Sequence, residues 1–133
     1  MEIFMKTLIL LILLVVAFVV VKRAMAGPSI TAGEADERVK ASTAVLIDVR
    51  EPDEWTGGVA GPALLCSLSD LRGPRAQWKT VLEANKDKEL ILYCASGARS
   101  GVAASILRKE GFNAVNAGGF GDWSRAGLPV REP

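Results

Sequence analysis

The sequence predicts an α/β domain built on a parallel β-sheet with helices on both faces, preceded by one N-terminal transmembrane helix. Two observations lead to this fold class. Residues 7–21 form an apolar run that contains no charged residue, glycine or proline. Beyond residue 30, short apolar segments alternate about five times with segments of helical pattern. Such alternation is typical of parallel strands that are connected through helices.

Residues 3–21 are long enough to cross a membrane. These 19 residues span roughly 28 Å at about 1.5 Å per helical residue, close to the thickness of the hydrocarbon layer. Lys6 lies near the start of the run, from where its side chain reaches the head groups. We therefore expect residues 1–23 to form a membrane anchor and residues 24–29 to form a linker.

A cleaved signal peptide is the alternative to a retained anchor. Ala24-Met25-Ala26 resembles the small-x-small pattern of a signal cleavage site. Lys22 and Arg23, however, follow the apolar run at once, and such charges favour a cytoplasmic location for the chain that follows. The sequence therefore favours a single-pass membrane protein with its domain in the cytoplasm. A periplasmic or secreted domain is the alternative.

Composition narrows the chemistry of the expected domain, residues 30–133. Beyond residue 23 the chain carries 13 Lys or Arg against 14 Asp or Glu and no basic run, so nucleic acid is not an expected partner. The chain has no histidine, which excludes Ser-His-Asp triads, Cys-His pairs and histidine-rich metal sites. Its two cysteines, Cys66 and Cys94, fit neither a disulfide framework nor a zinc site. We expect no metal ion and no cofactor.

The first half of the domain is predicted as helix, strand, short helix and strand. Thr31 and Glu34 have capping-box spacing, which starts a helix that runs to about Lys40. Proline and acids in "PDEW" favour the first turn of a short helix. The apolar runs 43–49 and 63–68 are predicted strands, and the glycine-rich residues 56–62 between them are a predicted loop.

The second half continues the alternation. Residues 69–84 are broadly helical, with an interruption at Gly73-Pro74, and residues 88–94 form the most apolar strand. A helix over 98–110 is predicted to end at Gly111, a typical C-cap residue. Residues 112–117 are the last predicted strand and 118–123 a glycine-rich turn. The three tryptophans, Trp55, Trp78 and Trp123, are expected to pack in the interior.

Cys94 occupies the position where this fold class collects its reactive groups. It ends the most apolar and therefore central strand, and reactive groups gather beyond the carboxyl ends of parallel strands. A thiolate there is favoured by the N-terminus of the helix near Ala98 and by the permanent charge of Arg99. The small residues between them let successive N–H groups turn inward as an anion-binding nest; they are Ala95, Ser96, Gly97 and Ala98. The sequence thus predicts a nucleophilic Cys94 that needs no histidine.

Four motifs resemble those of the single-domain rhodaneses, which are sulfurtransferases. "LIDVREPDEW", "YCASGARS", "GGFGDW" and "AGLPV" occur in the order and approximate spacing of that family and cover residues 29–131. The resemblance implies a five-stranded parallel sheet and a Cys94 that takes a sulfane sulfur from a donor such as thiosulfate or a persulfide. The sulfur then passes to a thiol acceptor. It also implies that the N–H groups of residues 95–99 cradle the anionic sulfur and that Arg99 helps to bind an anionic donor.

Asp48 and Arg50 match the family's "DVR". We interpret them as mainly structural, with pairing to Glu54, and keep a substrate role for Arg50 as the alternative. Many family members carry a histidine where this chain has Gly58, so the loop "GGVAGPA" is expected to be looser or to pack differently. Cys66 is either a small buried hydrophobe or a resolving thiol that attacks a persulfide on Cys94.

Other functions remain open at this point. An idle rhodanese module used for protein docking at the membrane would need neither Cys94 nor Arg99. A dithiol redox protein would require the Cα atoms of Cys94 and Cys66 to come within about 7 Å. Phosphatase or arsenate-reductase chemistry ranks last, because four residues separate Cys94 from Arg99, where the related phosphatases have five.

Overall fold

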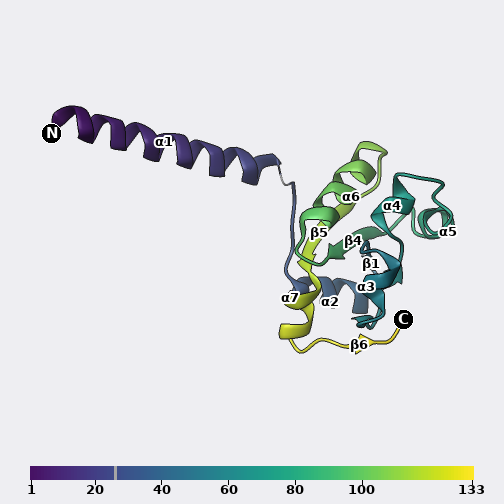
Figure 1. The fold of residues 1–133 in the computed structure, drawn as a ribbon. Helices are drawn as coiled ribbons and strands as arrows, with labels where there is room; N and C mark the ends of the chain where they lie inside the picture. The colour runs from purple at the N-terminus through teal and green to yellow at the C-terminus, as the bar shows by residue number, and fades with distance from the viewer. Residues whose placement is uncertain (26) are drawn as a thin grey trace.

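The computed structural model describes residues 1–25 and 27–133. Ala26 belongs to the predicted 24–29 linker and to the Ala24-Met25-Ala26 pattern, and it lies outside the described residues. Helix α1 (Glu2–Met25) extends two residues past the predicted boundary at residue 23. Its segment Glu2–Lys22 has a mean hydropathy of 3.0, none of it is buried, and it is long and apolar enough to cross a membrane. Figure 1 shows this helix at the N-terminal end of the chain.

The core is a four-stranded parallel sheet with the strand order β3-β1-β4-β5. The strands are β1 (Ala44–Asp48), β3 (Leu64–Leu65), β4 (Glu89–Cys94) and β5 (Ala114–Gly119). The prediction of a parallel sheet with the 88–94 strand at its centre is confirmed.

The family resemblance implies five strands, but the sheet of the described residues has four, and a single parallel bridge from Ser29 to Asn116 extends it at the β5 edge. Two features limit this extension to one bridge. Pro28 has no N–H to donate, and Thr31 caps the following helix by accepting from Glu34 N.

Helices cover both faces of the sheet (Figure 1). The α2 side (Ala32–Lys40) also carries α7 (Phe120–Arg125), and there Leu46, Ile91 and Tyr93 point into the core. The other side carries α4 (Leu68–Leu71), α5 (Trp78–Ala84) and α6 (Ala98–Lys109). Ile47, Leu92 and Cys94 point to that second side. The alternation along β4 therefore buries the Cys94 side chain beneath α6.

Most predicted elements are present with small shifts in their ends. Helix α3 (Pro52–Trp55) matches "PDEW". The interruption at Gly73-Pro74 separates α4 from α5, and Gly111, at φ +96°, follows the end of α6. Trp55, Trp78 and Trp123 are all buried, as expected for packing residues.

Two predictions for glycine-rich segments are wrong. The predicted turn 118–123 contains most of α7, because the Asp122 carboxylate accepts from Gly119 N at 3.0 Å and caps the helix. The predicted loop 56–62 contains β2 (Val59–Ala60), which pairs antiparallel with β6 (Val130–Arg131). Gly61 N donates to Pro129 O at 2.7 Å beside this pair. The loop that contains Gly58 is therefore held by the C-terminal segment rather than loose.

Candidate active site around Cys94

Cys94 lies at the carboxyl end of β4, between β1 and β5, and its side chain is fully buried. The chain then turns through residues 95–97 into α6. Gly97 makes this turn possible with a left-handed backbone, φ +95°. The predicted loop of Ala95, Ser96, Gly97, Ala98 and Arg99 thus curls over the sulfur, with Ala98 and Arg99 in the first turn of α6.

Hydrogen-bond donors converge on the sulfur. Gly97 N donates to Cys94 Sγ at 3.0 Å, and the Ser100 hydroxyl lies 3.3 Å from it. Burial raises the pKa of the Cys94 thiol, but the donors act against it: the hydroxyl and N–H of Ser100 and the N–H groups of Ser96 and Gly97. The donors prevail, and the pKa of Cys94 lies below its ordinary value. The N–H groups of Ser96 and Gly97 thus face the sulfur, as the predicted nest requires, and Ser100 is an added donor.

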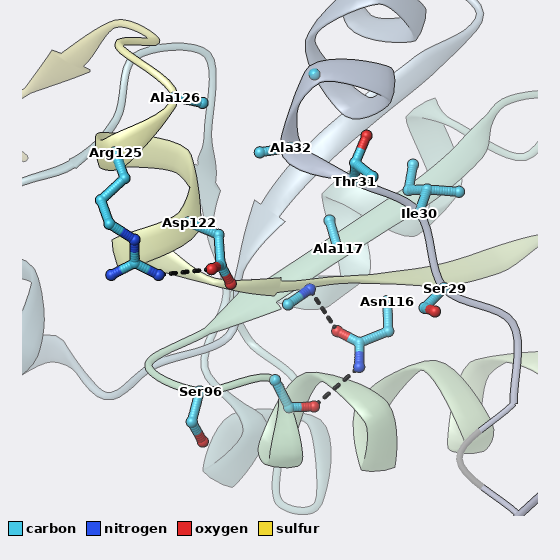
Figure 2. Close-up of a pocket in the computed structure, with 13 residues that line it drawn as sticks. Ser29, Ile30, Thr31, Ala32, Ser96, Asn116, Ala117, Asp122, Arg125 and Ala126 are labelled. Atoms are coloured by element: carbon cyan, nitrogen blue, oxygen red, sulfur yellow. Dashed lines mark hydrogen bonds and ion pairs between the residues drawn. The ribbon is translucent and has the colours of Figure 1, made fainter. Parts of the chain in front are cut away.

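Asn116 braces this loop from β5 (Figure 2). Its Nδ2 donates to Gly97 O at 2.9 Å, and its Oδ1 accepts from Gly118 N at 3.0 Å and from Ser100 Oγ at 2.7 Å. Sequence reasoning missed both Asn116 and Ser100. The available signal was an amide inside the apolar run "FNAVNA" and a hydroxyl on the inner side of a helix, since buried polar groups need partners.

The loop also requires a glycine on β5. A Cβ at Gly119 would collide with the carbonyl oxygen of Ala95. The β4–β5 register shifts between Leu92 and Cys94, and Cys94 pairs with Gly119. The close approach of β5 therefore fixes where the loop leaves the sheet.

Arg99, in the first turn of α6, forms a bidentate ion pair with Glu54 of α3. Its two terminal nitrogens lie 2.5 and 2.9 Å from the two carboxylate oxygens of Glu54. Hydrogen bonding to Arg99 is the main cause that lowers the pKa of Glu54 to about 2. The same contact raises the pKa of Arg99. The structure thus places Arg99 near Cys94, as predicted, but with its charge already partnered.

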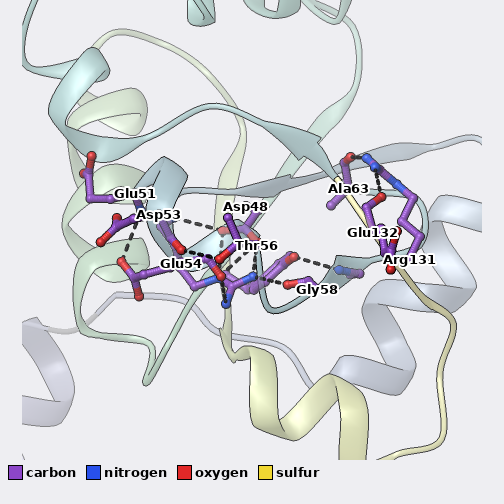
Figure 3. Close-up of polar contacts among 12 residues, drawn as sticks. Asp48, Glu51, Asp53, Glu54, Thr56, Gly58, Ala63, Arg131 and Glu132 are labelled. Atoms are coloured by element: carbon purple, nitrogen blue, oxygen red, sulfur yellow. Dashed lines mark hydrogen bonds and ion pairs between the residues drawn. The ribbon is translucent and has the colours of Figure 1, made fainter.

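Arg50 is a buried structural residue. Figure 3 shows Asp48 and Gly58, to which it is hydrogen-bonded, close together. Its guanidinium binds both carboxylate oxygens of Asp48, with Nη2 at 2.8 Å from Oδ2, and Nη2 also donates to Gly58 O at 2.8 Å. The ring of Phe120 lies beneath it, 4.5 Å from Cζ to the ring centroid. The predicted ion pair with Glu54 is wrong, because the Glu54 side chain turns to Arg99 and only its backbone oxygen meets Arg50, at 3.4 Å. The structural interpretation of Asp48 and Arg50 is supported.

Gly58 has a conformational reason to be glycine. Its φ is +113°, and this backbone directs its carbonyl to Arg50. Gly58 therefore contacts Arg50 through its main chain.

Cys66 is placed as a buried thiol rather than a resolving one. Its Sγ donates to Gln77 O at 3.4 Å, and burial is the main cause that raises its pKa to about 12. The register puts Cys66 and Cys94 on opposite sides of β1, with Val49 between them. Two strand spacings separate their Cα atoms by about 9.5 Å, beyond the reach of a disulfide. This arrangement argues against a Cys94–Cys66 dithiol.

A cleft of about 550 Å³ opens beside the loop (Figure 2). Ser96 and Gly97 line it from the loop, and Asn116 and Gly118 line it from β5. The start of α2 and the Asp122–Arg125 ion pair of α7 form its other walls. The cleft therefore borders the outer surface of the nest that holds the sulfur.

Comparison with known proteins supports one family. The model of the rhodanese-like domain matches residues 31–126. A sulfurtransferase of Allochromatium vinosum is 34% identical over 93 residues, which cover 67% of this chain and 79% of that protein. The uncharacterized protein YqhL of Bacillus subtilis is 39% identical over 95 residues, or 70% of this chain and 71% of that one. The crystal structure of a rhodanese-related protein from Thermoplasma volcanium is similar with a TM-score of 0.67 and 32% identity, over 80% of this chain and 100% of that one.

Proposed function

The chain belongs to the rhodanese-like domain family, and from this membership and the geometry around Cys94 we propose that it is a sulfurtransferase that carries sulfur as a Cys94 persulfide. The observation that carries the proposal is the set of donors on the sulfur, with Gly97 N at 3.0 Å and Ser100 Oγ at 3.3 Å. These groups stabilise the thiolate, which is the form of cysteine that attacks sulfur.

In the first half-reaction the Cys94 thiolate attacks the sulfane sulfur of a donor. A new S–S bond forms on Cys94 while the donor's own S–S bond breaks, and the electron pair leaves with sulfite from thiosulfate or with a thiolate from a persulfide. The inward N–H groups of the loop stabilise the charge of the Cys94 persulfide, and Asn116 holds that loop through Gly97 O. No net oxidation or reduction accompanies this transfer.

In the second half-reaction a thiol acceptor takes the sulfur. The acceptor thiolate attacks the outer sulfur, the Cys94–sulfur bond breaks, and Cys94 leaves as a thiolate. The low pKa of Cys94 makes it a good leaving group, so the same donors assist both half-reactions. A small sulfur donor and a thiol acceptor are therefore the proposed partners.

Intact mass measurement tests this proposal. The full-length protein in detergent is incubated with thiosulfate or with cysteine persulfide and compared with the Cys94→Ser and Cys66→Ser variants. We expect a gain of about 32 Da that cyanide removes, present in the Cys66→Ser variant and absent from the Cys94→Ser variant. No adduct from either donor would contradict the proposal and favour a docking module.

The site geometry supports the alternatives less well. A docking module has no use for a thiol with a depressed pKa under a braced loop. The dithiol requires a Cα approach that the β3-β1-β4 order disfavours. Phosphatase chemistry would need a wider loop than the four residues between Cys94 and Arg99.

We also infer that α1 is a retained single-pass anchor with the domain in the cytoplasm. The length and hydropathy of Glu2–Lys22 support the span, and Lys22 and Arg23 support the orientation. Membrane fractions should retain the full-length mass after carbonate washing. Protease added outside intact cells, after the outer envelope is opened, should leave the domain uncut; a soluble protein with a mass that lacks residues 1–26 would instead indicate a cleaved signal peptide.

A further inference from the structure

We propose that Glu54 is a specificity-determining residue, which neutralises Arg99 and so disfavours dianionic thiosulfate relative to persulfide donors of low charge. The inference rests on the proposed sulfurtransferase function and names the donor class of the same site. It reverses the role that the sequence suggests for Arg99.

The guanidinium of Arg99 is already bound by a carboxylate. Both terminal nitrogens of its guanidinium face the two oxygens of Glu54, at 2.5 and 2.9 Å. A guanidinium binds a carboxylate most strongly in this paired geometry. The side chains of Arg99 and Glu54 are 35% and 31% exposed, so solvent only partly screens the contact. An incoming anion would have to compete with a fixed carboxylate for the same donors.

The Glu54 carboxylate is held by its own helix as well as by Arg99. It sits in α3, and its Oε1 also accepts from Glu51 N at 3.1 Å, which ties the carboxylate to the start of its own helix. Its depressed pKa means that it stays ionised throughout the neutral range. The negative charge of Glu54 beside Arg99 is therefore permanent at neutral pH.

Carboxylates outnumber cations in the immediate surroundings of Arg99 and Glu54. Arg50 is the second cation near Glu54, but it is buried and paired with Asp48. The negative charge of Glu51 also contributes to the raised pKa of Arg99. The Ser69 hydroxyl donates to the Glu51 carboxylate at 2.7 Å. The two cations, Arg50 and Arg99, thus lie beside three carboxylates, and the Cys94 thiolate adds a further negative charge. The three carboxylates are those of Asp48, Glu51 and Glu54. Arg72 and Lys109 line a neighbouring cleft along α6, which Gly97 and Ala98 of the Cys94 loop also line.

These charges distinguish two classes of donor. A doubly charged thiosulfate meets about twice the repulsion that a singly charged donor meets at the same distance. The backbone N–H groups of the nest, by contrast, stabilise the terminal sulfur of either donor. Cysteine persulfide, which carries an ammonium beside its carboxylate, avoids most of the repulsion. Transfer from it forms the Cys94–sulfur bond and releases cysteine thiolate, so atoms and electrons balance.

The test compares two donors on the full-length protein and two matched variants. Glu54→Gln removes the charge and keeps a side chain that serves in a capping box. Glu110→Gln is the control, because Glu110 binds Arg75 in the same bidentate manner, at 2.6 and 2.8 Å and with both side chains 35% exposed. We expect Glu54→Gln to increase the second-order rate of Cys94 persulfide formation from thiosulfate about tenfold. The rate from cysteine persulfide should change less than twofold, and Glu110→Gln should change neither.

A measurement on the unmodified protein removes any dependence on how the variant folds. Salt screens repulsion, so the rate of Cys94 persulfide formation from thiosulfate should rise between low and moderate ionic strength. If Arg99 instead attracted thiosulfate, this rate would fall as salt is added. A falling rate, or a Glu54→Gln rate with thiosulfate within twofold of the unmodified protein, would overturn the inference while leaving the persulfide chemistry intact. No adduct from either donor would instead overturn the proposed function and the inference together.

Discussion

Ser100 places one hydroxyl between two acceptors, 3.3 Å from Cys94 Sγ and 2.7 Å from Asn116 Oδ1. A hydroxyl carries a single proton and can donate to only one of them at a time. When Cys94 is a thiol, the proton is best given to Asn116. When Cys94 is a thiolate, turning the hydroxyl to the sulfur stabilises the charge, and Gly118 N still satisfies Asn116 Oδ1 at 3.0 Å.

Replacing Ser100 should therefore raise the pKa of Cys94. In Ser100→Ala the thiolate loses a charge-assisted hydrogen bond, which corresponds to about 1 pKa unit. The rate of iodoacetamide alkylation between pH 5 and 10, followed by mass spectrometry, measures the pKa of Cys94. Ser105→Ala, on the outer side of α6, is the control. An unchanged alkylation profile would remove Ser100 from the stabilisation of the thiolate.

Replacing Asn116 should destabilise the domain and slow sulfur transfer. Asn116→Ala leaves Gly97 O and Gly118 N without their partner. These groups are only partly buried, so we expect a loss of about 1 kcal/mol, at the low end for unpaired buried groups. Urea unfolding measures the loss. The exposed Asn113→Ala should lie within about 0.5 kcal/mol of the unmodified protein, and equal effects of the two variants would contradict the bracing role.

Gly119→Ala should disturb the loop through a direct collision. The added Cβ would meet Ala95 O, so either β5 or the loop must shift. We expect a loss of about 1–3 kcal/mol, as for other overpacked sites, together with a slower formation of the Cys94 persulfide. Gly33→Ala provides the comparison, because it lies within α2 with its nearest neighbouring atom 4.0 Å away. That change should be neutral or slightly stabilising.

The Glu54–Arg99 pair should make part of the stability depend on pH. The pKa of Glu54 is about 2 in the folded protein against an ordinary 4.5, so the pair's contribution is complete above 4.5 and is lost as the pH falls toward 2. Thermal unfolding should show the Tm difference between the unmodified protein and Glu54→Gln shrinking over this interval. A Tm difference that stays constant down to pH 2 would show that the charge of Glu54 is not its cause.

Cys66 should be far less reactive than Cys94. Burial raises its pKa to about 12, whereas the pKa of Cys94 lies below its ordinary value. Iodoacetamide at pH 7 should modify one cysteine in the folded protein and both in urea, as peptide mapping would show. Rapid labelling of Cys66 in the folded state would contradict its assignment as a buried thiol.

The backbone of the site could be predicted from the sequence because it depends on local patterns. The apolar run 88–94 fixes β4, and the small residues before Ala98 fix a strand-to-helix turn with inward N–H groups. The side chains that complete the site could not be predicted in the same way. Glu54 and Arg99 lie 45 residues apart, so only the folded sheet reveals that Arg99 is partnered.

The errors have two different origins. Three glycines in "GGFGDW" favour a turn, but Asp122 accepts from Gly119 N, three residues earlier, and this local cap favours a helix. Arg50 and Glu54 lie four residues apart in the sequence, which favours the predicted ion pair. In the folded domain Asp48 lies closer to Arg50, and Arg99 takes the Glu54 carboxylate.

The short bridge at the edge of the sheet also limits how far the domain can lie from the end of α1. Asn116 is hydrogen-bonded on both sides by the incoming chain, through Pro28 O and Ile30 N. Only two residues then separate α1 from the domain, a reach of about 11 Å between the Cα atoms of Met25 and Pro28. If α1 is a membrane anchor as proposed, this short connection keeps the domain close to the lipid surface, and the proposed sulfur donor and acceptor would have to reach Cys94 there.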